Sequence, residues 1–329
     1  MNAFVIRSGL LCALACLLTC GRTVAEPPAE KADAKQKKAP LYDPTVDARV
    51  QLDAAVAKAK RDHSRVLVMF GFEGCVWCHR LHALLASDAA LRAVIKAEYV
   101  EVLVDIKAPH ADAVLKECKA ALSPDELDKG VGYPFLAVLD GNGKVLTAQR
   151  TDPLEEGKGH NPKRVKEFLD KWVAPRADAQ AILDAALAAA DKDGKQVFIH
   201  FGAPSCGWCH RLDNFLARED IAALLGPDFV DVKIDISRMD HGKDVLATYR
   251  KGDAGGIPWF VIVDAKGKAV VTSDGPKGNI GYPYEPHEID QFLVILKQSA
   301  RKLEPAQMDQ IEAALRKTRD DIERERKRP

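Results

Sequence analysis

The motif Cys-x-x-Cys-His occurs twice in this chain of 329 residues, at 75–79 and at 206–210. Two different chemistries use this spacing. Cys-x-x-Cys-His is the attachment signature of c-type haem, whereas two cysteines three residues apart at the start of a helix can form and open a disulfide. Each motif directly follows a short apolar run typical of a buried strand. The surrounding elements must therefore decide between the two chemistries.

The residues around the first motif predict alternating strands and helices. A helix over 46–56 precedes an apolar strand over 66–70, and the motif then begins a helix over 77–85. The elements expected next are a strand over 99–105, a helix over 111–122, strands over 135–139 and 145–147 joined by a Gly-Asn-Gly turn, and a helix over 162–172. This order is βαβα followed by ββα.

The same order recurs after Pro175. We expect a helix over 177–190, a strand over 197–201, the second motif, a strand over 230–236 and a hairpin at 266–267. The residues shared at constant offsets are Cys75, Cys78, His79, Arg80 and Leu81 with Cys206, Cys209, His210, Arg211 and Leu212, and Pro134, Asp140, Gly143 and Lys144 with Pro258, Asp264, Gly267 and Lys268. An internal duplication of one domain explains these matches.

A strand, Cys-x-x-Cys, a helix and an apolar-Pro-aromatic segment before a hairpin together resemble the thioredoxin superfamily, over nearly the whole mature chain. The resemblance implies an α/β fold of two tandem thioredoxin-like domains, each a three-layer α/β/α sandwich with a mixed sheet. The interleaved charges near the C-terminus add a charged helix after them. The Trp-Cys-His-Arg-Leu string further resembles bacterial thioredoxin-like proteins with Trp before the second cysteine. Unlike thioredoxin, the chain has no Gly-Pro between the cysteines.

The segments 133–135 and 257–259 resemble the family's cis-proline loop, which lies beside the cysteine pair and presents backbone to a substrate peptide. We therefore expect cis bonds before Pro134 and Pro258. The tryptophans inside the motifs are expected to form an apolar rim that grips polypeptide, although packing at the start of a helix is the alternative. The expected substrate-binding residues are Trp77, Trp208, Tyr133, Pro134, Ile257 and Pro258.

The first cysteine of each pair is the expected nucleophile. A thiol at a helix N-terminus meets free N–H groups and the positive end of the helix dipole, which stabilise the thiolate. Cys75 and Cys206 occupy this position, so Cys78 and Cys209 are expected to resolve the mixed disulfides that the nucleophiles form.

Three histidines are candidates for proton transfer. His79 and His210 follow the second cysteines, where an imidazole can carry a proton, although contact with the helix surface alone is the alternative. The buried acid that the family usually places six residues before the first cysteine is replaced by Met69 and His200. We expect His200 to accept the proton of the resolving thiol, which would make the two sites kinetically unequal.

Three alternatives assign the cysteines other roles. Both pairs together could hold zinc, each pair could be an inert disulfide, or the Cys and His ligands could bind copper(I) in a non-catalytic module. A dihaem cytochrome is disfavoured because Met69, Met239 and Met308 are the only methionines of the mature chain, and Met69 lies within an expected strand. We therefore expect no cofactor and no metal.

The N-terminus resembles an export signal. Arg7, an apolar stretch and Thr-Val-Ala before Glu26 predict a signal peptide over 1–25 and a periplasmic or secreted protein, with a lipid anchor at Cys20 as the alternative. Residues 26–40 are expected to form a disordered linker. The expected domains are 41–175 and 176–303, followed by a charged helical tail over 304–329 that is mostly solvated and packs weakly on the second domain.

Composition limits the partners. The sequence has 48 lysine and arginine residues together and 48 aspartate and glutamate residues together, so its net charge is zero. Net charge therefore gives no reason to expect nucleic acid or an anionic membrane as a partner. No segment after the leader is apolar enough to cross a membrane. The expected partners are protein thiols and disulfides and an upstream redox protein, with redox direction and oligomeric state left open. Cys118 is expected to be a thiol buried in a helix.

Overall fold

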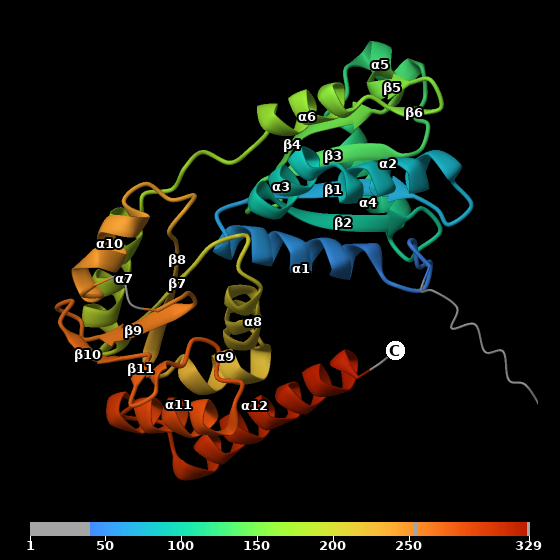
Figure 1. The fold of residues 1–329 in the computed structure, drawn as a ribbon. Helices are drawn as coiled ribbons and strands as arrows, with labels where there is room; N and C mark the ends of the chain where they lie inside the picture. The colour runs from blue at the N-terminus through green and yellow to red at the C-terminus, as the bar shows by residue number, and fades with distance from the viewer. Residues whose placement is uncertain (1–39, 253–254, 328–329) are drawn as a thin grey trace, which may run out of the picture. The chain divides into compact units, whose positions relative to one another are not determined.

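A computed structural model describes residues 40–252 and 255–327 of the protein. The predicted signal peptide, the lipid-anchor alternative at Cys20 and nearly all of the predicted linker lie outside these residues. From Pro40 onward the chain forms one compact unit that contains two four-stranded mixed sheets (Figure 1). The predicted fold class, two tandem thioredoxin-like α/β domains, is confirmed.

The first sheet has the strand order β2-β1-β3-β4. Strand β1 pairs in parallel with β2 and antiparallel with β3, which in turn pairs antiparallel with β4. The strands are β1 (Arg65–Gly71), β2 (Tyr99–Asp105), β3 (Phe135–Leu139) and β4 (Val145–Arg150). A short hairpin, β5 (Glu155–Glu156) and β6 (Gly159–His160), follows them.

Helices cover both faces of this sheet because successive strand residues point to opposite sides. Val66, Val68 and Phe70 pack with α1 and α4, whereas Leu67 and Met69 pack with α2, α3 and α6. The helices are α1 (Ala48–Arg61), α2 (Val76–Ser87), α3 (Ala89–Glu98), α4 (Ala111–Lys119), α5 (Pro124–Asp128) and α6 (Pro162–Lys171), with a 3-10 turn η1 (Asp152–Leu154).

The second domain repeats this plan with the strand order β10-β9-β7-β8. Its strands are β7 (Gln196–Gly202), β8 (Phe229–Asp235), β9 (Trp259–Val263) and β10 (Ala269–Thr272), followed by the hairpin β11 (Asp274–Gly275) and β12 (Gly278–Asn279). Its helices are α7 (Ala179–Asp193), α8 (Gly207–Leu216), α9 (Glu219–Leu225), α10 (Gly242–Tyr249), α11 (Pro286–Ser299) and α12 (Pro305–Arg326). Helix α7 packs on one face of the sheet, and α8, α9 and α11 pack on the other.

The C-terminal helix α12 is more firmly packed than its charged sequence predicts. Ile311, Leu315 and Ile322 are buried in the same apolar cluster as Phe292 of α11. The predicted helix is present and most of its side chains are exposed or partly exposed, but the expectation that it packs weakly is wrong. These three side chains lie four and seven residues apart, so they form one stripe along the helix, and the charged residues occupy its other faces.

Helices α3 and α9 were not predicted from the sequence. Helix α3 begins at Asp88, whose carboxylate accepts hydrogen bonds from the N–H groups of Ala90 and Leu91. Such a cap allows a short helix to begin directly after α2. Within the described ranges, the structure contains no helix with the length and apolar character that a membrane crossing requires.

Candidate active site

Each cysteine pair lies where a central strand ends and a helix begins. Cys75 is the N-cap of α2, and the Cys78 N–H points at its Sγ at 3.2 Å. Cys206 caps α8 in the same way, with the Cys209 N–H at 3.1 Å. A sulfur in this position receives a backbone donor and the positive end of the helix dipole, both of which favour a thiolate.

Both pairs are closed as disulfides, with Cα–Cα distances of 5.3 Å for Cys75–Cys78 and 5.2 Å for Cys206–Cys209. In each pair the second cysteine is the more buried. Cys78 is fully buried while Cys75 is 7% exposed, and Cys209 is 6% exposed while Cys206 is partly exposed. An attacking client thiol therefore reaches the first sulfur more readily, as the predicted division into nucleophile and resolving cysteine requires.

The expected proline loops lie beside the cysteines. The Tyr133–Pro134 and Ile257–Pro258 bonds are both cis, as predicted. The Tyr133 carbonyl oxygen lies 3.6 Å from Cys75 Sγ, and the Ile257 carbonyl oxygen lies 3.4 Å from Cys206 Sγ. Proline has no N–H, so each loop presents an acceptor and a ring to its site rather than a donor.

The two histidines that follow the cysteine pairs make matching contacts. His79 Nε2 lies 2.7 Å from the Glu73 carbonyl oxygen, and His210 Nε2 lies 2.8 Å from the Pro204 carbonyl oxygen. An imidazole can meet a carbonyl oxygen only as a donor, which assigns the proton to Nε2 in both residues. Both histidines thus hold the loop before the cysteines in place, and proton transfer by either one stays a prediction.

His200 is buried in β7, on the face of the sheet that packs against α8. Its Nε2 lies 3.3 Å from Asp231 Oδ1, and Lys233 is its register neighbour on β8. The equivalent position of the first domain holds Met69, which packs among apolar side chains. Only the second domain therefore has an ionisable group at this point of the central strand.

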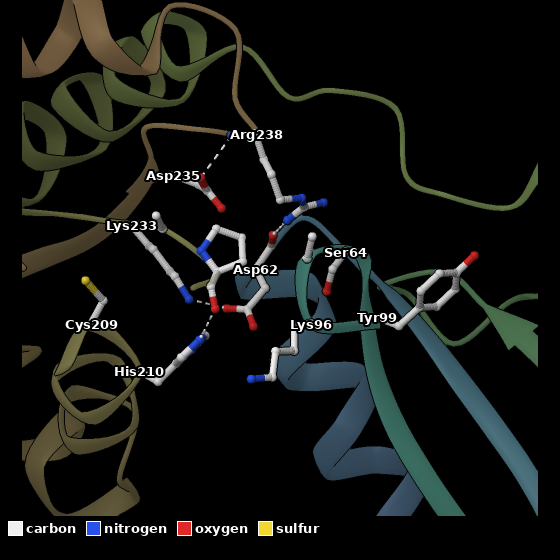
Figure 2. Close-up of a pocket in the computed structure, with 12 residues that line it drawn as sticks. Asp62, Ser64, Lys96, Tyr99, Cys209, His210, Lys233, Asp235 and Arg238 are labelled. Carbon is white, nitrogen blue, oxygen red and sulfur yellow. Dashed lines mark hydrogen bonds and ion pairs between the residues drawn. The ribbon is translucent and has the colours of Figure 1, made fainter. Parts of the chain in front are cut away.

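A buried charge cluster that the sequence did not reveal lies next to Cys209. Lys233 Nζ donates to Asp62 Oδ1 at 2.6 Å and to Asp213 Oδ2 at 3.1 Å. Lys233, Asp62, Cys209 and His210 line a cavity of about 40 Å³. Their side chains are drawn in Figure 2. Burial disfavours the charge on Asp62, yet Lys233 and Lys58 more than offset this effect and keep its pKa below the usual range.

Arg238 joins the two domains close to this cluster. Its guanidinium donates to both carboxylate oxygens of Glu98, at 3.1 and 2.8 Å, and to the carbonyl oxygens of Asp62 and His63. Bidentate pairing of this kind fixes orientation as well as distance. Residues of the first domain therefore form part of the surroundings of the second cysteine pair.

The tryptophans differ in their surroundings. Trp208 is 37% exposed and stacks on Tyr282, with ring centroids 5.9 Å apart. It lines a groove of about 430 Å³ together with Ile257, Pro258, Tyr282 and Tyr284. Trp77 is half-buried against His160. The structure thus brings three predicted substrate-binding residues of the second site into one groove, and substrate binding itself stays a prediction.

Cys118 is separate from both pairs. It is buried in α4 without a disulfide partner, as expected, and burial raises the pKa of its thiol to about 12. In the part of the chain that the structure describes, no three His, Cys, Asp or Glu side chains are grouped to hold a metal ion.

Weak signals for the missed residues exist in the sequence. In β8, Asp231 and Lys233 alternate with Val230, Val232 and Ile234, which places two charges on one face of a strand within a covered sheet. Such charges must be paired. Asp62 and Asp213, the partners of Lys233, come from distant segments and carry no signal of their own, whereas Asp231 lies beside His200.

The comparison with protein families agrees with this geometry. The thioredoxin-like family model matches residues 47–141 and 178–265, which together include both cysteine pairs. The chain belongs to this family.

Individual relatives cover smaller parts of the chain. Human spermatogenesis-associated protein 20 is 32% identical over 71 residues, which are 21% of this chain and 9% of that protein. A disulphide isomerase from Xylella fastidiosa Temecula1 is 30% identical and covers 37% of this chain and 92% of its own, with a TM-score of 0.32. Zinc-bound human ERp44 is 14% identical and covers 79% of this chain and 60% of its own, with a TM-score of 0.26.

Proposed function

We propose that the protein is an exported thiol-disulfide oxidoreductase that exchanges disulfides with protein substrates through its two cysteine pairs. One observation carries the proposal. In both domains a less buried sulfur caps a helix N-terminus, faces the carbonyl of the residue before a cis-proline, and has a more buried partner cysteine within disulfide distance. This arrangement supplies a stabilised thiolate, a place for client backbone and a resolving thiol.

The exchange proceeds in two balanced steps. A client thiolate attacks Cys75 or Cys206, which forms a mixed disulfide and releases the second cysteine as a thiolate. A second client thiolate then attacks the client sulfur of that bond, which leaves a client disulfide and a reduced protein pair. The reverse sequence oxidises the protein and reduces the client, and the relative stability of thiolates and disulfide sets the direction.

Removal of the resolving cysteine tests the proposal. Cys78→Ser and Cys209→Ser variants should accumulate mixed disulfides with client proteins, because no internal thiol can release the client. The adducts should be sensitive to reducing agent on a denaturing gel. Cys75→Ser/Cys78→Ser and Cys206→Ser/Cys209→Ser are the matched controls. Absence of adducts from both single variants would contradict disulfide exchange.

Export is proposed from the N-terminal sequence pattern alone. A mature protein that begins at Glu26 and fractionates with the periplasm or the medium is expected. Recovery in the membrane fraction, lost on Cys20→Ser, would instead support the lipid anchor. A protein that retains residues 1–25 in the cytoplasm would contradict both.

A further inference from the structure

Tyr42 lies in an irregular segment before α1, yet its side chain is 0% exposed. The segment is attached to the first active-site loop, because the N–H groups of Leu41 and Tyr42 donate to Glu73 Oε2 at 2.9 and 3.2 Å. Glu73 comes two residues before Cys75. The tyrosine is therefore held directly against the first cysteine pair.

The phenol hydroxyl and the resolving sulfur approach the same point above β1. A Cβ atom on Gly71 would lie 2.7 Å from Tyr42 Oη and 2.7 Å from Cys78 Sγ. Tyr42, Cys75 and Cys78 accordingly form one buried cluster. Glycine at position 71 leaves the space in which the hydroxyl and the sulfur face each other.

The Tyr42 hydroxyl is buried without a hydrogen-bond partner among the described residues. A buried hydroxyl without a partner lowers the stability of the folded protein by about 1–3 kcal/mol. We therefore expect this hydroxyl to find an acceptor in another state of the protein. Burial first, and then the carboxylates of Glu101, Asp105 and Glu73, raise the pKa of Tyr42 well above its ordinary value. The phenol therefore keeps its proton and is available as a donor.

We propose that the Tyr42 hydroxyl donates a hydrogen bond to Cys78 Sγ when the first site is reduced and Cys78 is a thiolate, and so stabilises the reduced pair relative to the disulfide. A disulfide sulfur is a weak acceptor, whereas a thiolate is a strong one. The inference rests on the proposed thiol-disulfide chemistry. Tyr42 is not consumed: two glutathione thiols supply the two electrons, the Cys75–Cys78 bond breaks, glutathione disulfide forms, and each of the two protons goes to a cysteine sulfur that is a thiol or, where the sulfur is a thiolate, to solvent.

The second site has no equivalent group. Val173 precedes Cys206 by the same number of residues as Tyr42 precedes Cys75, so it is the residue that corresponds to Tyr42. Its side chain is 36% exposed. A Cβ on Gly202 would meet Cys209 Cβ at 2.9 Å and Cys209 Sγ at 3.3 Å, with no hydroxyl nearby. The second site thus provides an internal reference in the same chain.

The test is a glutathione redox titration of Tyr42→Phe in a chain that retains only the first pair (Cys206→Ser/Cys209→Ser). Loss of the donor should lower the equilibrium constant for reduction about tenfold, because a hydrogen bond of this kind contributes about that factor. For a two-electron couple, this is a shift of about 30 mV to a more negative potential. An unchanged titration of the folded variant would overturn the proposal.

Two controls separate the hydrogen bond from general destabilisation. Tyr99→Phe removes a buried hydroxyl that donates to the Leu169 carbonyl, at the end of the sheet opposite Cys75. It should lower stability without moving the potential of the first site. Tyr42→Phe should also leave the second pair unchanged in a chain with Cys75→Ser/Cys78→Ser. An equal shift at both sites would contradict a local bond.

A second variant keeps the test decisive if Tyr42→Phe does not fold. Glu73→Ala removes the exposed carboxylate that holds the Tyr42 segment and retains the phenol. The potential of the first site should move in the same direction by a smaller factor, and no movement would count against the proposal. The titration uses glutathione and no client protein, so its outcome does not depend on the trapping of clients. Failure to trap clients would refute the proposed function, but it would not change the measured effect of Tyr42→Phe on the first site.

Discussion

The two active sites share their backbone frame and differ in what covers the resolving cysteine. In both, a cysteine sulfur caps a helix, the carbonyl of the residue before a cis-proline faces the first cysteine, and a histidine donates to a loop carbonyl. Cys78 lies against the phenol of Tyr42, whereas Cys209 borders a cavity with Lys233 and Asp62. The comparison teaches that the frame defines the reaction, while the covering residues can give each site its own potential and pH response.

The second site also depends on the first domain. Asp62 follows α1 of the first domain, and its carboxylate lies 2.6 Å from Lys233 Nζ. Burial lowers the pKa of Lys233, but the carboxylates of Asp62 and Asp213 outweigh this effect and raise the pKa above its usual value. Lys233 therefore remains charged. A cation beside a resolving sulfur favours its thiolate. No charged residue occupies the matching position in β2, which is Leu103.

The largest expected difference concerns His200. We expect His200→Met to slow exchange at the second site by about 100-fold, which is the lower end of what a positioned proton acceptor contributes. The measurement is the exchange rate from pH 5 to pH 8 in chains that retain one cysteine pair each. The first site, which has Met69 at this position, is the matched control.

In wild type, the pH profile of exchange at the second site should differ from that of the first, because only the second site has an imidazole at this point of the central strand. The carboxylate of Asp231 and the ammonium of Lys233 flank this imidazole and will shape the profile. Superimposable pH profiles of the two sites, or no effect of His200→Met, would show that His200 only packs in the core and takes no part in proton transfer.

A smaller effect is expected from Asp62→Asn, which leaves Lys233 with one carboxylate. We expect the free energy of unfolding to fall by about 1–3 kcal/mol near neutral pH, because a largely buried ammonium loses half of its partners. Since folding lowers the pKa of Asp62, its contribution is present above the unfolded value of about 4 and is lost as the pH falls through the folded value. Denaturant unfolding at several pH values measures this difference.

Asp193→Asn is the matched control, because Asp193 corresponds to Asp62 in the second domain and lies 4.0 Å from Lys195 in a more exposed pair. Its effect should be close to zero. A loss from Asp62→Asn that persists unchanged below pH 4 would contradict the ionic origin of the stabilisation.

Local patterns explain what the sequence could predict. The apolar runs before Cys75 and Cys206 end in short loops that lead directly into α2 and α8, so the sulfur positions follow from neighbouring residues alone. Tyr42 and Asp62 could not be identified in this way, because tertiary packing brings them to the cysteines. Helix α12 was misjudged for a similar reason, since Ile322 lies among charged neighbours and only the packed structure shows its partner surface.

Alkylation of the fully reduced protein near pH 6, followed by mass spectrometry of each cysteine, tests the assignment of nucleophiles most directly. Cys75 and Cys206 should be labelled much faster than Cys78 and Cys209, because they are the less buried members and cap their helices as thiolates. Cys118, with its buried thiol, should stay unlabelled and report that the protein is folded. Equal labelling of all four motif cysteines, with Cys118 still protected, would contradict the account.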